Sequence, residues 1–119
     1  MAGSHKPIVW GLFAGGGTVA AFVLPALILL TSLAVPLGLL PAESLAYERV
    51  LAALQHPLAR LIVFGVVFLM IWHAAHRTRI TAHDFGVRQD ALVMWLCYGI
   101  AAVGSVVAAV ALLRLGSTM

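Results

Sequence analysis

The sequence has 119 residues, of which 63% are hydrophobic and only 9% are charged. A soluble domain carries about 25% charged residues, so this chain is too apolar to cover its own surface and is expected to be an integral membrane protein. Its net charge of +3 does not indicate nucleic-acid binding, because the seven Lys and Arg residues are spread along the chain and form no basic stripe. The single cysteine, Cys97, lies in an apolar run and is expected to be a small buried hydrophobe, with no disulfide or zinc-ligand spacing around it.

The first apolar run, residues 7–42, contains no charged residue. A spanning helix needs about 20 residues, and the pattern predicts one over residues 9–34 with a kink at Pro25, since proline removes a backbone hydrogen bond and clashes with the preceding turn. Helix-breaking residues then end it, namely Pro36, Gly38 and Pro41.

Residues 43–56 alternate polar and apolar side chains at helical spacing, with Leu45, Val50, Leu51 and Leu54 as the apolar stripe. This pattern predicts a short amphipathic helix at the membrane interface. Two further spans are predicted over residues 58–75 and 90–113, the second beginning at Asp90, whose charge favours a helix start. The complete prediction is therefore one all-α membrane domain, residues 1–119, with three transmembrane helices and a short interfacial helix between the first and the second.

Three spans place the two termini on opposite sides of the membrane. One side carries four basic residues, Lys6 at the N-terminus and Arg77, Arg79 and Arg88 in the second connection; the other carries Arg49, Arg60 and Arg114. The excess of basic residues favours a cytoplasmic N-terminus. All three tryptophans, Trp10, Trp72 and Trp95, fall at span ends on this same side and are expected to form an aromatic belt.

Six titratable side chains gather at the end of the second span: His73, His76, Arg77, Arg79, His83 and Asp84. Apolar runs flank this group on both sides. Titratable side chains concentrated at one membrane face indicate proton or electron chemistry there, or support for a partner that carries it out.

Small residues recur in the spans, with Gly11 and Gly15 four residues apart, the run Gly15 to Gly17, and Gly99 with Gly104. Small faces let transmembrane helices approach closely. They suggest a subunit packed in a larger bundle, because three spans with no charge inside them form no pump or channel alone.

Several of these segments, taken together, resemble the D-type subunit of fumarate reductase. The similarity lies in VWGLFAGGG at residues 9–17, PLGL at 36–39, LAYERVL at 45–51, and the pairs His76-Arg77 and His83-Asp84. Order and spacing agree from about residue 9 to residue 98, whereas the last span is similar only in character. Residues 77–81, RTRIT, depart from the histidine-rich run expected of the family.

The resemblance implies a membrane anchor without catalytic residues or a metal site of its own. Together with a second, C-type anchor, it would hold a flavoprotein and an iron–sulfur subunit at the cytoplasmic side of a bacterial inner membrane. The complex would oxidise menaquinol and pass electrons through the iron–sulfur clusters to the flavin, where fumarate becomes succinate. Flavin and clusters would lie only in the partners, menaquinone would bind where subunits meet, and no haem is expected.

The resemblance also assigns residues. Trp10, His76 and Arg77 would contact the quinone, while His83 and Asp84 would dock the soluble subunits. His73 has no counterpart in the family and is kept as an additional polar site or a haem-ligand candidate. Gln55 and His56, on the opposite side, are expected to contact lipid headgroups rather than a second quinone.

Two other functions are weighed against this one. A haem-b-containing succinate dehydrogenase anchor would show haem absorbance, and a non-redox small membrane protein would purify without flavin and iron–sulfur subunits.

Overall fold

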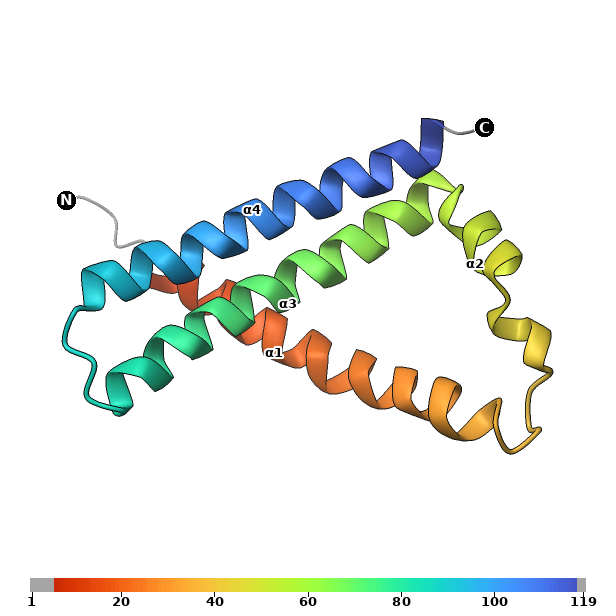
Figure 1. The fold of residues 1–119 in the computed structure, drawn as a ribbon, viewed down its shortest axis with the longest axis horizontal. Helices are drawn as coiled ribbons and strands as arrows, with labels where there is room; N and C mark the ends of the chain where they lie inside the picture. The colour runs from red at the N-terminus through yellow and green to blue at the C-terminus, as the bar shows by residue number, and fades with distance from the viewer. Residues whose placement is uncertain (1–5, 118–119) are drawn as a thin grey trace.

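The computed structural model describes residues 6–117, and every element within that range is helical (Figure 1). In chain order these elements are α1 (Lys6–Ile28), the π-helical η1 (Leu29–Ala34), the 3₁₀ turn η2 (Ala42–Leu45), α2 (Tyr47–Leu54), α3 (Pro57–Asp84) and α4 (Asp90–Ser117). Three helical segments are long and apolar enough to cross a membrane: Lys6–Ala34, Pro57–Asp84 and Asp90–Ser117. The predicted all-α fold, with a short helix between the first and second spans, is confirmed.

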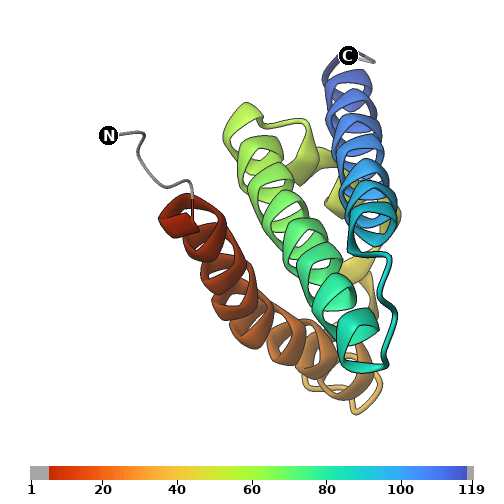
Figure 2. The same cartoon turned by 90° about the vertical axis from the view of Figure 1, so that its left-hand side faces the viewer.

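Helix α3 lies between the other two spans (Figure 2). It packs along α4 as an antiparallel hairpin, while α1 crosses it near the start of α1 and then diverges (Figure 1). The start of α1 and the turn between α3 and α4 therefore lie at one end of the molecule, here called the polar end. Helix α2 and the end of α4 lie at the other, here called the far end.

Helix α3 is longer than the span expected from the sequence. The predicted span ended at residue 75, but the helix continues to Asp84. The expectation that Arg77 and Arg79 lie in a connection between helices is therefore wrong, and the polar residues that follow Ala75 project from a regular helix. Neither threonine nor arginine breaks a helix, so no residue of this stretch ends α3 before Gly86.

Glycines with positive φ end the first and second spans. Gly86 has φ +86°, its N–H donates to the carbonyl of His83, and the N–H of Val87 donates to that of Ala82. Gly38 has φ +75°, its N–H donates to the carbonyl of Val35, and the next N–H donates to that of Ala34. This arrangement satisfies the last carbonyls of a helix and requires a residue that tolerates the left-handed region.

The proline inside α1, Pro25, does not end the helix. The chain continues in α geometry to Ile28 and then widens into the π-helical segment η1, where the N–H of Val35 donates to the carbonyl of Leu30. The helix-breaking residues that follow end the span, as the sequence predicts.

The predicted helix over residues 43–56 is divided in two. Ala46 is extended, with φ −60° and ψ 143°, and separates η2 from α2. Leu51 and Leu54 turn toward the rest of the chain and are half-buried, whereas Val50 is exposed. The side chain of His56 caps α3, because its Nδ1 accepts a hydrogen bond from the N–H of Leu58 at 3.2 Å.

Helices α1 and α3 meet at glycines. A Cβ at Gly16 would collide with the carbonyl oxygen of Leu69 and the Cβ of His73, and one at Gly17 would meet the His73 ring. Gly11, Gly15 and Gly99 instead face open space within this chain. Only two of the glycines predicted to mediate packing in the first span therefore do so internally.

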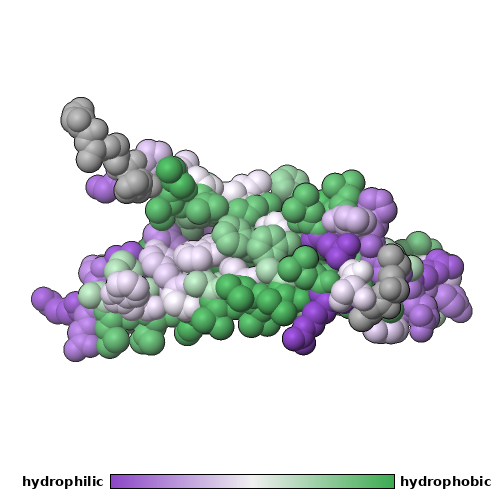
Figure 3. All heavy atoms as spheres, turned by 90° about the horizontal axis from the view of Figure 1, so that it is seen from above, coloured by the Kyte–Doolittle hydropathy of each residue, from purple (hydrophilic) through white to green (hydrophobic). Residues whose placement is uncertain are grey.

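Few side chains of the described residues are buried, and those that are buried are small, such as Ala75, Ala101 and Ser105. Large apolar side chains cover the middle of the molecule, and polar ones gather mostly toward the two ends (Figure 3). Such an exterior suits lipid or other membrane subunits rather than water.

Candidate functional site

The predicted polar cluster lies on the last turns of α3 at the polar end. Its six residues differ in their surroundings: His73, His76 and Arg79 are half-buried, while Arg77, His83 and Asp84 are exposed. The half-buried members contact α1 and α4, so the cluster is a set of interhelical contacts with an exposed rim.

His73 fixes α1 against α3. Its Nδ1 lies 2.8 Å from the carbonyl oxygen of Phe13, and because a carbonyl only accepts, Nδ1 carries the proton and donates it. The imidazole also stacks on the Phe13 ring, with centroids 4.5 Å apart and 17° between the planes. The residue that the sequence left without a role is therefore a packing residue.

Helix α1 covers one face of the His73 ring. The ring lies over Gly17, where even one added carbon would collide with the imidazole. Across residues 6–117 the structure also contains no group of three or more His, Cys, Asp or Glu side chains that could hold a metal ion.

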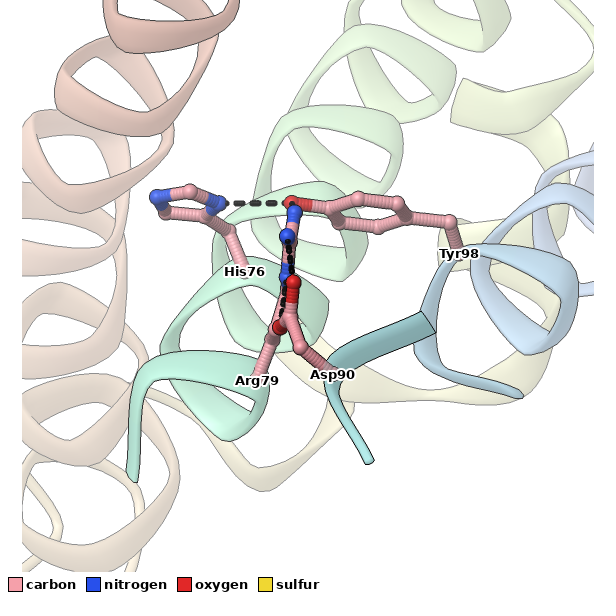
Figure 4. A network of polar contacts seen from close by, with 4 residues as sticks. All are labelled: His76, Arg79, Asp90 and Tyr98. Carbon is pink, nitrogen blue, oxygen red and sulfur yellow. Dashed lines mark hydrogen bonds and ion pairs between the residues drawn. The ribbon is translucent and has the colours of Figure 1, made fainter. Parts of the chain in front are cut away.

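His76 points the other way, toward α4. Its Nδ1 lies 2.7 Å from the hydroxyl oxygen of Tyr98 (Figure 4). The edge of the ring meets Phe13, with centroids 4.8 Å apart and 64° between the planes. His76 is therefore held between α1 and α4 by one aromatic residue from each.

Arg79 completes this arrangement. Its Nε and Nη2 donate to the two carboxylate oxygens of Asp90, at 2.9 and 2.6 Å, and its Nη1 donates to the Tyr98 oxygen at 3.4 Å (Figure 4). The guanidinium carbon lies 5.6 Å from the centre of the Tyr98 ring. A planar guanidinium suits this two-bond contact with a carboxylate. The chain His76–Tyr98–Arg79–Asp90, here called the tyrosine network, ties the end of α3 to the start of α4.

The tryptophans do not form a uniform belt. Trp10 and Trp95 are exposed, at 69% and 73%, as a belt requires. Trp72 instead turns inward, and its Nε1–H donates to the hydroxyl of Ser105 at 3.2 Å. An indole N–H buried between helices needs such an acceptor. The prediction of a three-tryptophan belt is wrong for Trp72.

Trp10 lies one turn before Phe13 on the same face of α1, since residues three apart share a helix face. The contacts that join α1 to His73 and His76 come from Phe13. Trp10 therefore lies at the border of the predicted site.

Two hollows flank the polar part of α3. One, of about 510 Å³, is lined by His73, Ala74, Arg77, Thr78, Thr81, Ala82 and Phe85. The other, of about 360 Å³, is lined by His76, Arg79, Ile80, His83 and Asp90. His76 and Arg77 therefore border different hollows, as neighbours about 100° apart around a helix do. All the lining residues of the first hollow come from α3 and the residue after it, so α1 and α4 contribute no wall to it.

The residues predicted to dock the soluble subunits lie at the tip of the polar end. His83 and Asp84 are exposed in the last turn of α3, and Phe85, directly after them, is 84% exposed. An exposed aromatic ring between charged residues is the composition expected of a contact surface.

A third hollow lies at the far end, between the start of α3 and the end of α4. It has a volume of about 340 Å³ and an almost wholly apolar lining formed by Pro57, Arg60, Leu61, Phe64, Ala109, Leu112 and Leu113. Arg60 folds back over Gly116. On this side His56, which was expected to contact lipid headgroups, is the N-cap residue of α3.

Sequence reasoning missed Tyr98 and Ser105, which lie inside an apolar span. Asp90 was expected only to stabilise the start of its own helix. A signal was present, because Asp90 and Tyr98 are eight residues apart, a spacing that places both on one face of a helix. Polar residues on one face of a transmembrane helix indicate a partner on the neighbouring helix.

Known proteins resemble this chain along most of its length. The sequence model of the family described as the D-type fumarate reductase subunit matches residues 1–113. The protein of that name from Mycobacterium bovis is 42% identical over 108 residues, which is 88% of this chain and 84% of the relative. Its counterpart from Vibrio parahaemolyticus is 38% identical over 98 residues, covering 82% and 78%, and that of Vibrio campbellii is 36% identical over 107 residues, covering 90% and 86%. The chain therefore belongs to the family of D-type fumarate reductase subunits, membrane anchors of an oxidoreductase complex.

Proposed function

We propose that this chain, together with a second, C-type anchor, attaches the flavoprotein and iron–sulfur subunits of fumarate reductase to the bacterial inner membrane. Family membership and three helices long enough to cross a bilayer support this role. Fumarate is reduced at the flavin of the partner, and this chain contributes no catalytic residue to that step.

The polar end faces the cytoplasm and the soluble subunits in this proposal. Four of the seven basic residues, Lys6, Arg77, Arg79 and Arg88, belong to that end, which favours the cytoplasmic side. The exposed tip formed by His83, Asp84 and Phe85 offers charged and aromatic groups for docking.

The polar end also helps to form the site at which menaquinol is oxidised. Oxidation of one quinol releases two electrons and two protons. The electrons pass to the iron–sulfur clusters of the partner, and the protons leave to water at the cytoplasmic surface. A chain of polar side chains at the edge of an apolar bundle is where a quinol headgroup can meet both a proton acceptor and the bilayer that holds its tail.

Three residues have roles in this site. His76 forms a hydrogen bond with a quinone oxygen or carries a proton, since histidine changes charge near neutral pH. Arg77 supplies a fixed positive charge that favours anionic, reduced forms of the quinone. Trp10 borders the headgroup with its exposed indole ring.

The observation that carries the proposal is the placement of His76 at the polar end. It is the half-buried titratable residue held by both neighbouring helices, through Phe13 and Tyr98. A histidine that serves only as a headgroup contact has no need of such fixation.

The test compares two electron donors in the intact four-subunit complex. Menaquinol must pass through the anchor, whereas a reduced viologen dye delivers electrons directly to the soluble subunits. The His76→Ala complex is expected to lose about 100-fold in menaquinol-driven fumarate reduction and to keep its dye-driven rate. His56→Asn is the matched control, because asparagine preserves the helix cap at the far end. Equal menaquinol-driven rates in the wild-type and His76→Ala complexes would refute the role of His76.

A further inference from the structure

The hydrogen bonds around Tyr98 determine which nitrogen of His76 can meet a ligand. The Tyr98 oxygen accepts from Nη1 of Arg79 and lies 2.7 Å from Nδ1 of His76. Arginine has no acceptor atom, so the hydroxyl hydrogen of Tyr98 does not point to Arg79 and is free to point to Nδ1 of His76. When the Tyr98 hydroxyl donates to Nδ1, a neutral His76 carries its proton on Nε2, the nitrogen that points away from Tyr98 in Figure 4.

Asp90 fixes Arg79 in turn. The two-bond contact with the carboxylate uses Nε and one N–H of Nη2, and it orients Nη1 toward Tyr98. The Tyr98 ring also contacts the Trp72 ring, with centroids 5.8 Å apart. Both the ring and the hydroxyl of Tyr98 are thus fixed before any ligand arrives.

From this geometry, and on the basis of the proposed function, we infer that Tyr98, held by Arg79 and Asp90, is a positioning residue for quinol oxidation that orients His76 so that Nε2–H faces the quinone headgroup. Tyr98 does not touch the quinone in this arrangement and acts only through His76. Nε2–H is a donor suited to a quinone carbonyl or to the negative charge that develops on a quinol oxygen as its proton leaves to water. With Nδ1 occupied by the Tyr98 hydroxyl, His76 is the hydrogen-bond donor in this step and water is the proton acceptor.

The chemistry at His76 differs from that at the neighbouring histidines. Nδ1 of His73 donates to the Phe13 carbonyl, so that ring is fixed by the backbone of α1. His83 is exposed at the tip of α3. Among these three, only His76 is oriented by a side-chain hydroxyl, which can be removed by a substitution that deletes a single oxygen atom.

Tyr98→Phe removes that hydroxyl and keeps the ring against Trp72 and Arg79. The experiment measures menaquinol-driven and viologen-driven fumarate reduction in the intact complex for wild type, Tyr98→Phe, His76→Ala and the double variant. Tyr98→Phe should lower menaquinol-driven kcat/KM about three- to tenfold, the range expected for one hydrogen bond. The dye-driven rate should not change. Tyr47→Phe, the other tyrosine and 73% exposed on α2, is the matched control and should have no effect.

The double variant separates positioning from packing. If Tyr98 acts through His76, Tyr98→Phe causes no further loss once His76 is alanine. Asp90→Asn, which weakens the fixation of Arg79, should lower the menaquinol-driven rate in the same direction but by less than Tyr98→Phe.

Each remaining outcome decides a different question. An equal loss from Tyr98→Phe in both backgrounds, or no loss where His76→Ala alone is impaired, overturns the positioning role and leaves the proposed function standing. No loss from either substitution overturns the assignment of His76 itself and the inference with it.

Discussion

Arg79 and Asp90 form a two-bond ion pair, at 2.9 and 2.6 Å, between the last turns of α3 and the first turn of α4. The pair closes the hairpin at the polar end, where a five-residue connection joins α3 to α4. It also sets the position of Tyr98, so a single contact links the fold of this end to the proposed site.

Breaking this ion pair should destabilise the hairpin modestly. The side chains are 27% and 45% exposed, so water screens their attraction. Arg79→Gln or Asp90→Asn is therefore expected to lower the thermal unfolding midpoint of the detergent-solubilised complex only slightly. The loss should shrink at high salt. If the reversed pair, Arg79→Asp with Asp90→Arg, is no more stable than either single reversal, the contact does not stabilise the hairpin.

Gly16→Ala should separate α1 from α3. The added Cβ has no space, because it would collide with the backbone of Leu69, and overpacking of this kind costs about 1–3 kcal/mol. Thermal unfolding of the purified complex reports this loss. Gly15→Ala is the neighbouring control, since a Cβ there meets nothing within 4 Å in this chain. Equal destabilisation by both substitutions would contradict the packing described for α1 and α3.

Gly86→Ala should weaken the turn after α3. At φ +86° the left-handed conformation costs an alanine about 1–2 kcal/mol. Gly99→Ala, in the middle of α4 and facing open space, should instead be neutral or stabilise the helix by up to about 1 kcal/mol. Denaturant or thermal unfolding of the two variants should therefore show a loss only for Gly86→Ala, and a comparable loss in both would count against this description of the turn.

Ser105→Ala should leave the indole N–H of Trp72 without its acceptor. Interhelical hydrogen bonds in membranes contribute about 0.6–1.7 kcal/mol, and that is the expected loss of unfolding free energy. Trp72→Phe removes the donor of the same pair, so after it Ser105→Ala should cost little more. A full additional loss in the double variant would show that the hydroxyl of Ser105 stabilises α4 by some other route.

The sequence was sufficient for the architecture. Apolar runs long enough to cross a bilayer predicted three helices, and Pro36, Gly38 and Pro41 predicted the end of the first. The end of α3 was harder to predict. Polar residues ended the expected span at residue 75, whereas the helix continues to Asp84 and is terminated by the turn at Gly86, where a positive φ is needed. Hydropathy reports where a helix leaves an apolar environment, and backbone conformation reports where it stops.

The candidate site was predicted in its location but not in its contacts. The polar cluster on α3 was visible in the sequence, but its partners Phe13 and Tyr98 are apolar or nearly so and lie 63 and 22 residues away from His76. No local pattern tells which face of α3 meets α1 and which meets α4. That choice is made by Gly16 and Gly17, which let α1 approach His73 and leave His76 to turn toward α4.

Photoaffinity labelling tests most directly whether the quinol headgroup binds at the polar end. A photoreactive naphthoquinone analogue would be crosslinked to the intact complex in the presence and absence of excess menaquinone, and the labelled peptides identified by mass spectrometry. If the quinol headgroup binds at the polar end, menaquinone-sensitive labelling is expected in residues 73–81 of α3 or in the segment around Trp10. Specific labelling confined to residues 57–64 and 109–113, which line the apolar hollow at the far end, would contradict a quinol site at the polar end.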